Sequence, residues 1–227
     1  TVPFVSKATG NPIAKIAARI MSGEKLSSMS LNTAKQEHVA VKEAVFPFAR
    51  FPGVDVFLGP EMKSTGEVMG IDKEFGIAFA KSQLGAGVDL PISGTVFISI
   101  KDADKPAFVE ICHSLIESGL EICATDGTTK YLNKAGIPAR RVNKVLEGRP
   151  HAVDAMLSGE IDLVFNTAHG VAAIQDSLSL RQTALTNNIP YYTTMSGSRA
   201  AVAAIRALQK TKLSAKSIQD YLHSVSS

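Results

Sequence analysis

From Leu90 onward, short apolar segments alternate with longer amphipathic segments, and this alternation constrains the fold more than any other feature of the sequence. The short segments are rich in β-branched residues and are predicted strands; the longer ones repeat apolar residues at helical spacing. The predicted strands are 95–100, 120–124, 137–142, 161–165 and 189–193. The predicted helices are 105–118, 128–135, 153–157, 176–187, 198–209 and 214–223. Such alternation indicates an α/β fold, a doubly wound parallel sheet with helices on both faces.

The first 90 residues lack this regular alternation and are predicted to form an α+β unit. Its predicted elements are a helix over 13–21 opened by Asn11 as N-cap and Pro12 at the first helical position, an extended segment with Val39, Val41 and Val45, a loop-rich segment over 51–60, and a helix that Asp72 caps and that ends at Gly85 or Gly87. The sequence therefore predicts two units, 1–90 and 91–227.

The composition excludes several classes of protein. Apolar residues are 45% and charged residues 20% of the chain, as in globular proteins. The net charge of +3, without a run of Lys or Arg, argues against a nucleic-acid partner. No apolar stretch approaches the ~18 residues of a membrane span, so no membrane partner is expected. Cys112 and Cys123 fit neither a metal site nor a disulfide framework and are predicted buried thiols of a reducing, cytoplasmic compartment.

Small polar residues follow four of the predicted strands, where parallel sheets bind ligands. They are Thr125-Asp126-Gly127-Thr128-Thr129, Asn143-Lys144, Asn166-Thr167-Ala168-His169-Gly170 and Thr193-Thr194-Met195-Ser196-Gly197. Free backbone N–H groups at a helix start favour an anion, and Lys144 and Lys105 offer positive charge. The pattern predicts a phosphate-binding pocket, with ordinary helix capping as the alternative for each loop.

Other polar residues have simpler interpretations. His151 and His169 are interpreted as capping or surface residues. Ser196 lacks the flanking glycines of a nucleophile elbow. The acidic and basic residues Glu61, Lys63, Glu67 and Asp72 are expected to be solvated or to support the fold. No His, Cys, Asp or Glu cluster has a metal-ligand spacing, so no metal site is predicted.

Long sequence strings resemble carbamoyl-phosphate synthase large chains across essentially the whole chain. Strings in the first unit resemble the end of the family's C-terminal ATP-grasp domain: VPFVSKATG at 2–10, FPGVD at 51–55 and GPEMKSTGEVMG at 59–70. Strings in the second unit resemble its methylglyoxal-synthase-like regulatory domain: AT-x-GT at 124–128, VNKV-x-EGRPH at 142–151, where x is a position outside the pattern, and Asn166-Thr167. The resemblance implies that 1–90 is the remnant of an ATP-grasp domain and 91–227 an allosteric domain.

The resemblance also implies the activity of the parent enzyme. The family makes carbamoyl phosphate from bicarbonate, glutamine-derived ammonia and two ATP, with Mg²⁺ or Mn²⁺ and K⁺, for arginine and pyrimidine synthesis. The implied partners are the remainder of the large chain and a glutaminase small subunit, in an oligomer. The family's metal and nucleotide ligands fall before Thr1, so this chain is expected to hold no catalytic residue and no cofactor, and to be inactive alone.

In the family, the regulatory domain binds nucleoside monophosphates such as UMP, an inhibitor, or IMP. The implied phosphate and sugar contacts are Lys105, Thr125, Thr128, Lys144 and Asn166. Ala168 departs from the family's usual hydroxyl residue, and the missing hydrogen bond is expected to weaken binding by ~1 kcal/mol.

The family also has an ornithine activation site between the two units. Its positions fall on Glu43, Phe46, Leu58, Tyr191, Tyr192 and Thr193. Phe46 replaces a leucine, and Tyr192 replaces an aspartate of the bacterial pattern. Because an ornithine ammonium needs carboxylate partners, the sequence leaves ornithine activation an open question.

Two alternatives remain for the second unit. Methylglyoxal synthase shares the expected fold, but it carries a Gly-Gly-Asp motif where this chain has Glu147-Gly148-Arg149. The other alternative is an interaction module that binds no small ligand.

Overall fold

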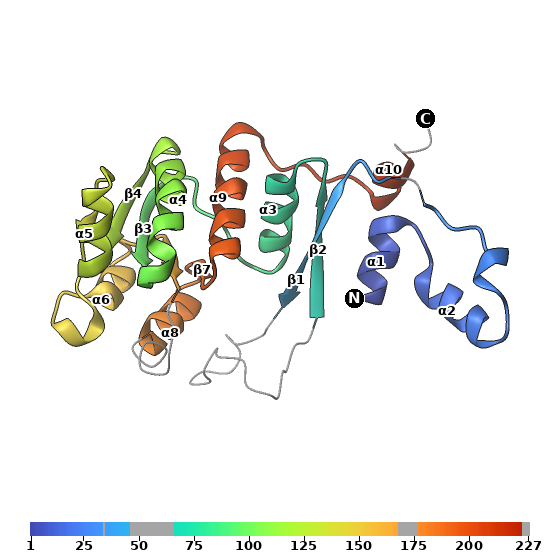
Figure 1. Cartoon of the computed structure of the whole chain (residues 1–227), viewed down its shortest axis with the longest axis horizontal. Helices are drawn as coiled ribbons and strands as arrows, with labels where there is room; N and C mark the ends of the chain where they lie inside the picture. Colours follow the sequence, from blue (N-terminus) through green and yellow to red (C-terminus); the bar gives the residue numbers. More distant parts are fainter. Residues whose placement is uncertain (34, 46–65, 168–176, 224–227) are drawn as a thin grey trace.

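A computed structural model of the chain describes residues 1–33, 35–45, 66–167 and 177–223 (Figure 1). Several residues singled out in the sequence lie outside the described residues: Phe46, Leu58, Glu61, Lys63, Ala168 and His169, together with the predicted loop 51–60. The described chain is elongated: two helices near the N-terminus form one end and a parallel sheet the other.

The described residues of the N-terminal part form three α-helices and a two-stranded antiparallel sheet. The helices are α1 (Val2–Thr9), α2 (Ile13–Met21) and α3 (Phe75–Gly85), and the strands are β1 (Val39–Val45) and β2 (Gly66–Asp72). A short 3-10 helix spans Leu26–Ser28. The predicted helix over 13–21 and the predicted extended segment at Val39–Val45 are confirmed. Pro12 is the N-cap of α2, one position before its expected place in the first turn.

The prediction that Asp72 caps the next helix is wrong. Asp72 ends β2, and α3 begins at Phe75 with Glu74 at its N-cap. The Asp72 carboxylate instead accepts a hydrogen bond of 2.8 Å from the Lys73 N–H, which supports the turn between strand and helix. Its other oxygen lies 2.7 Å from the Lys81 ammonium, so Asp72 supports the fold as expected.

The C-terminal part is built on a five-stranded parallel sheet in the order β5-β4-β3-β6-β7. The strands are β3 (Gly94–Ser99), β4 (Leu120–Ala124), β5 (Arg140–Arg141), β6 (Leu163–Asn166) and β7 (Tyr191–Tyr192). All the predicted strands are present, which confirms the α/β class. The edge strands β5 and β7 are only two residues long, and each pairs with a single neighbouring strand.

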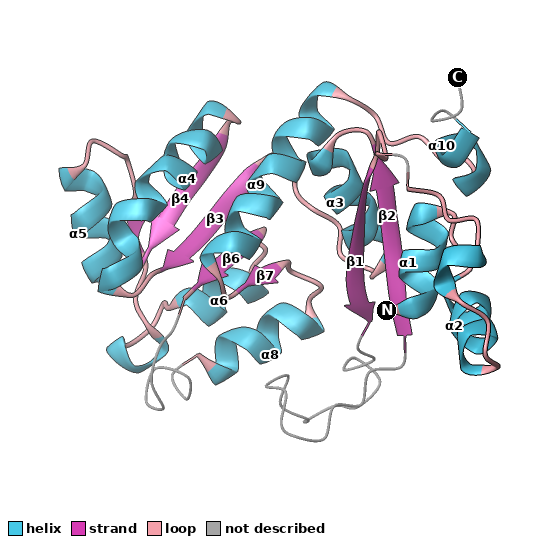
Figure 2. Cartoon of the chain, turned by 45° about the vertical axis from the view of Figure 1, so that its right-hand side comes forward, coloured by secondary structure: helices cyan, strands magenta, loops and turns pink. Residues whose placement is uncertain are grey.

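Helices cover both faces of this sheet (Figure 2). They are α4 (Lys105–Glu117), α5 (Asp126–Lys134), α6 (Ala152–Leu157), α8 (Leu178–Thr186) and α9 (Met195–Lys210), with 3-10 turns at Asp102–Asp104 and Val145–Glu147. A further helix, α10 (Ile218–His223), lies away from this sheet. Successive strand residues point to opposite faces. Val96 and Ile98 thus face the core under α4 and α9, whereas Phe97 faces α6 and α8.

The last helix returns to the N-terminal part of the molecule. Helix α10 lies beside α1 (Figure 1), and the Tyr221 hydroxyl on α10 lies 3.1 Å from the Lys81 ammonium on α3. Helix α3 also packs closely on α9, since a Cβ on Gly76 would lie 2.6 Å from the carbonyl oxygen of Ala203. The two predicted units therefore contact each other through α3, α9 and α10; the boundary near residue 90 stays a prediction.

No described helix combines the length and the apolar composition needed to span a membrane.

Candidate functional site

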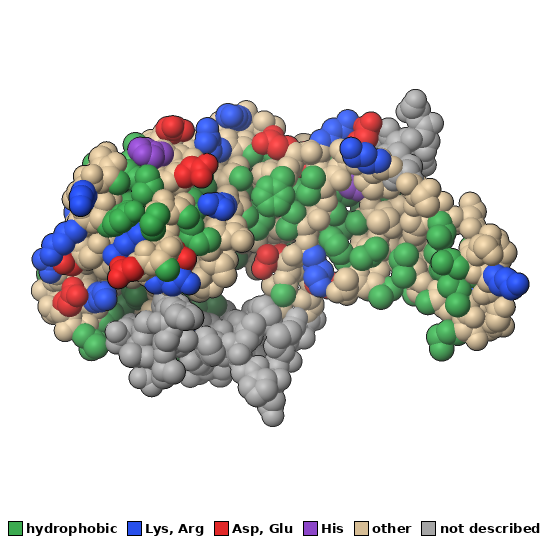
Figure 3. All heavy atoms as spheres, viewed as in Figure 1, with side chains coloured by type: hydrophobic (Ala, Val, Ile, Leu, Met, Phe, Trp, Pro, Cys, Tyr) green, Lys and Arg blue, Asp and Glu red, His purple; other side chains and the backbone are tan. Residues whose placement is uncertain are grey.

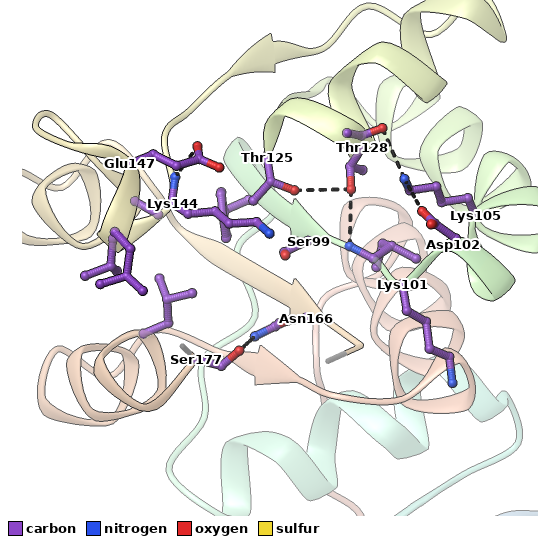
Figure 4. Close-up of a pocket in the computed structure, with 17 residues that line it drawn as sticks. Ser99, Lys101, Asp102, Lys105, Thr125, Thr128, Lys144, Glu147, Asn166 and Ser177 are labelled. Carbon is purple, nitrogen blue, oxygen red and sulfur yellow. Dashed lines mark hydrogen bonds and ion pairs between the residues drawn. The ribbon is translucent and has the colours of Figure 1, made fainter. Parts of the chain in front are cut away.

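A cavity of about 530 Å³ opens at the carboxyl ends of β3, β4 and β6 (Figure 4). Its volume lies within the usual range for small-molecule sites. All five predicted effector contacts line it: Lys105, Thr125, Thr128, Lys144 and Asn166. The lining also includes polar residues that the sequence analysis did not single out as contacts, chiefly Ser99, Lys101, Gly127 and Ser177, and apolar ones, chiefly Val145, Leu146 and Leu180.

The junction of β4 and α5 presents backbone N–H groups to this cavity. Thr125 is the N-cap of α5, yet its side chain does not cap the helix. Its hydroxyl instead lies 3.3 Å from the Thr128 hydroxyl, which also accepts a hydrogen bond of 3.3 Å from the Ile100 N–H. The first N–H groups of a helix have no partner within it and sit at its positive end. This junction can therefore take up an anion, and the capping alternative is wrong for Thr125.

Lys105 stands beside the start of α5 and is fixed by two contacts. Its ammonium lies 2.6 Å from the Asp102 carboxylate and donates a hydrogen bond of 3.2 Å to the Gly127 carbonyl oxygen. The hydrogen bond and charge of Lys105 lower the pKa of Asp102. The Lys105 side chain is only 12% exposed, so it is a positioned cation rather than a freely moving surface lysine.

Lys144 brings a second cation from the opposite side of the cavity. Its backbone N–H donates a hydrogen bond of 3.1 Å to the Glu147 carboxylate, which fixes the start of the 3-10 turn Val145–Glu147. Its side chain extends toward the space between Thr125 and Asn166 (Figure 4). Within the described residues, the Lys144 ammonium has no hydrogen-bond or ion-pair partner, so its charge is available to a ligand.

Asn166 ends β6 and is 3% exposed. Its side-chain N–H groups donate hydrogen bonds of 2.8 Å to the Ser177 hydroxyl and 2.6 Å to the Tyr191 hydroxyl. The sequence analysis identified Asn166 but not these two hydroxyls as its partners, because no local pattern connects residues on different strands and helices.

The loop after the fifth predicted strand does not belong to this cavity. The Thr194 hydroxyl accepts a hydrogen bond of 3.0 Å from the Gly197 N–H, so Thr194 caps α9. Among the described lining residues there is none from 193–197. The expectation that the residues after β7 join the pocket is wrong, because the Thr194 hydroxyl is used to cap α9; here the capping alternative is confirmed.

The two thiols and His151, among the described residues, are engaged in the core or in helix capping. Cys112 and Cys123 are buried, as predicted, and burial raises the pKa of each thiol to about 12. His151 is the N-cap of α6 and accepts a hydrogen bond of 3.3 Å from the Asp154 N–H, which confirms its capping role. Within the described residues, no group of three or more His, Cys, Asp or Glu side chains is placed to hold a metal ion.

The described ornithine-site positions divide between two locations. Tyr191 contacts Asn166, whereas Tyr192 contacts the N-terminal part, as expected for neighbouring residues of one strand. The Tyr192 hydroxyl donates a hydrogen bond of 2.9 Å to the Gln83 side-chain oxygen. The Gln83 nitrogen in turn donates one of 3.0 Å to the Glu43 carboxylate. Thr193 is exposed beyond the end of β7.

Burial dominates the electrostatics of this second location. Burial raises the pKa of Glu43, and the hydrogen bond from Gln83 opposes that rise only in part. Burial and the nearby Glu43 charge both raise the pKa of Tyr192. Gln83, which connects these two residues, was missed by the sequence analysis because a glutamine in an amphipathic helix carries no signal of its own.

Comparisons with known proteins agree with the resemblance. Residues 107–193 match the family model described as the MGS-like domain. Carbamoyl phosphate synthase large chains from Mesorhizobium japonicum and Myxococcus xanthus are 53% and 54% identical over 97% and 98% of this chain. This chain spans only 20% and 21% of their lengths. A methylglyoxal synthase structure from Elizabethkingia anophelis is 18% identical, with a TM-score of 0.39, and the match covers 51% of this chain and 80% of that one.

The likeness to the synthase chains extends over nearly the whole sequence. The chain is therefore a homologue of the carbamoyl phosphate synthase large chain that carries an MGS-like domain.

Proposed function

We propose that the cavity binds a nucleoside monophosphate such as UMP or IMP, and that the chain is the effector-binding part of an enzyme that makes carbamoyl phosphate. One observation carries the proposal: five residues from four separate segments line one cavity between a helix N-terminus and the Lys144 ammonium, which has no partner among the described residues. The remainder of the large chain, the glutaminase subunit and the ATP-dependent chemistry belong to the proposed parent enzyme, in the cytoplasm.

The two ends of the cavity suit the two ends of a nucleotide. The N–H groups at the start of α5, with Lys105 and Lys144, would hold the phosphate. Asn166 would contact the sugar. Val145, Leu146 and Leu180 supply apolar surface on which a base would pack. Phosphate charge would then be neutralised at one end, while the base would be removed from water at the other.

Binding to the 227-residue chain tests the proposal directly. Isothermal titration calorimetry with UMP and with IMP should show one site, and Lys144→Ala should weaken it roughly tenfold to a hundredfold, because a charged hydrogen bond is lost. Lys134→Ala is the matched control, since Lys134 is exposed in the last turn of α5, at the end opposite the cavity. Equal affinities of wild type and Lys144→Ala would refute the assigned pocket.

Two activity assays separate this function from its rivals. We expect neither ATP turnover nor methylglyoxal formation from dihydroxyacetone phosphate by the isolated chain. Glu147 lies in the region where methylglyoxal synthase carries its Gly-Gly-Asp motif. Its carboxylate already accepts a hydrogen bond from the Lys144 backbone N–H. Methylglyoxal formation above the uncatalysed rate would favour the lyase. An interaction module would bind neither nucleotide.

A further inference from the structure

Asn166 is oriented by two hydroxyl groups, of which that of Ser177 belongs to a lining residue of the cavity and that of Tyr191 does not. Both of its side-chain N–H groups are used, one by Ser177 and one by Tyr191. Within the described residues its side-chain oxygen has no hydrogen-bond partner, while the residue lines the cavity. The oxygen is therefore an acceptor, complementary to a sugar hydroxyl or to an N–H of a base. Rotation of this amide would break both bonds, so Tyr191 and Ser177 determine what Asn166 presents.

Tyr191 is held through its hydroxyl by the Arg181 side chain on α8, while its short strand needs support from outside the sheet. β7 has two residues and pairs only with β6, so its own ladder is weak. The next residue, Tyr192, supplies that support. Its ring centroid lies 5.9 Å from that of Phe165 and 6.4 Å from that of Phe79, and its hydroxyl donates to Gln83.

Gln83 connects this support to the N-terminal part of the molecule. It is 4% exposed, and its amide joins the Tyr192 hydroxyl to the Glu43 carboxylate on β1. Hydrogen bonds thus connect Glu43 on β1 with Gln83 on α3, and Gln83 with Tyr192 on β7. The neighbouring Tyr191 is hydrogen-bonded to Asn166 in the cavity.

We propose that Tyr191 and Tyr192 are positioning residues for nucleotide recognition: Tyr192, anchored on Gln83 and Glu43, holds β7 so that Tyr191 fixes the Asn166 amide with its oxygen toward the ligand. This inference rests on the proposed function, since it concerns how the same cavity distinguishes a nucleotide from free phosphate. Because binding linkage is reciprocal, a nucleotide that uses Asn166 also favours this arrangement of Gln83 and Glu43.

The sheet topology separates the phosphate end from Asn166. β3 lies between β4, which leads to Thr125, and β6, which ends at Asn166. Two strand spacings place these strand ends about 10 Å apart. Inorganic phosphate at the start of α5 is too small to reach Asn166, whereas a nucleoside monophosphate spans that distance. Loss of positioning should therefore weaken nucleotide binding and leave phosphate binding unchanged.

Calorimetric titration of the 227-residue chain with UMP, IMP and inorganic phosphate tests this distinction. Tyr191→Phe and Tyr192→Phe keep the rings and remove only the hydroxyls. Each should weaken nucleotide binding roughly threefold to tenfold, with phosphate affinity within about twofold of wild type. Tyr221→Phe is the matched control: it removes a hydrogen-bonded hydroxyl near α3 but away from β7, and should change neither affinity. Unchanged nucleotide affinity in both test variants, or equal loss of phosphate and nucleotide binding, would overturn the proposal.

A second measurement does not depend on any ligand. The side-chain amide signals of Asn166, followed by ¹⁵N NMR, should shift and exchange faster with solvent in Tyr191→Phe and in Tyr192→Phe, but not in Tyr221→Phe. If neither nucleotides nor phosphate bind to wild type, the proposed function fails, and these signals still decide the positioning role. Signals identical to wild type in both test variants would exclude it.

Discussion

The parallel sheet and the α1–α2 end of the molecule differ most in the burial of their apolar side chains. In β3, the side chains of Val96, Phe97 and Ile98 are fully buried. Helix α2 has apolar residues at helical spacing but no buried residue, and Met21 is 89% exposed. Figure 3 shows hydrophobic side chains gathered on the surface over α1 and α2. An apolar pattern in the sequence can therefore predict a helix without predicting that its apolar side chains are buried. In the parallel sheet the apolar residues are also buried, whereas in α2 they are not.

The largest expected effect tests whether burial sets stability in these two regions. Phe97→Ala should cost about 3–5 kcal/mol, because it leaves a cavity between the sheet and helices α6 and α8. Ile20→Ala on α2, where the side chain is 41% exposed, should cost no more than about 0.5 kcal/mol. Urea unfolding of both variants gives the two values. Equal losses would show that α2 belongs to the same cooperative core as the sheet.

A pair of glycines on β2 makes the comparison within one strand. A Cβ on Gly70 would overlap the Ala78 carbonyl oxygen of α3, whereas one on Gly66 would meet no atom within 4 Å. Gly70→Ala should therefore cost about 2 kcal/mol or more through overpacking, and Gly66→Ala should be nearly neutral. Urea unfolding measures both, and a tolerated Gly70→Ala would mean that β2 and α3 are less closely packed than described.

Tyr221 tests whether α10 is fixed to the N-terminal part. Its hydroxyl lies 3.1 Å from the Lys81 ammonium and donates a hydrogen bond of 3.3 Å to Asp72. Tyr221→Phe should lower stability by about 1 kcal/mol, as expected for such hydrogen bonds. Hydrogen exchange should accelerate in α10 and stay unchanged in α9. Acceleration confined to the sheet would contradict this docking.

The smallest effect concerns Glu43, the half-buried carboxylate between the two regions. Burial raises its pKa above the usual 4.5 in the folded chain. The folded state then binds a proton more tightly than the unfolded state, so stability falls as the pH rises from 4.5 through the folded pKa. Glu43→Gln removes this dependence.

Thermal unfolding across a pH series checks the sign for Glu43. At pH 7 the melting temperature of Glu43→Gln should exceed that of wild type by a few degrees at most. The difference should vanish below pH 4.5, where the carboxyl group of wild type is protonated in both states. A variant less stable than wild type at pH 7 would indicate that the charged carboxylate stabilises the fold.

The sheet was predictable because each strand carries its own apolar pattern and each helix its own periodicity. The largest errors fell where local signals are weakest. The edge strands β5 and β7 were predicted longer than they are, and Asp72 was taken for a helix cap although its carboxylate supports a turn. The five cavity residues were predictable from strand ends and family resemblance. The hydrogen bonds of Asn166 to Ser177 and Tyr191 were not predictable, because they join distant segments of the chain.

The sequence by itself determined the order of strands and helices, the α/β class and the residues of the candidate nucleotide site, since periodicity, turn residues and motif strings are local. Only the tertiary structure decided which strand ends share a cavity and that Tyr191 and Tyr192 face different parts of the molecule. It also decided that Thr194 caps α9 and does not line the cavity. Those outcomes depend on strand order and on packing between residues far apart in the chain, which a local pattern does not encode.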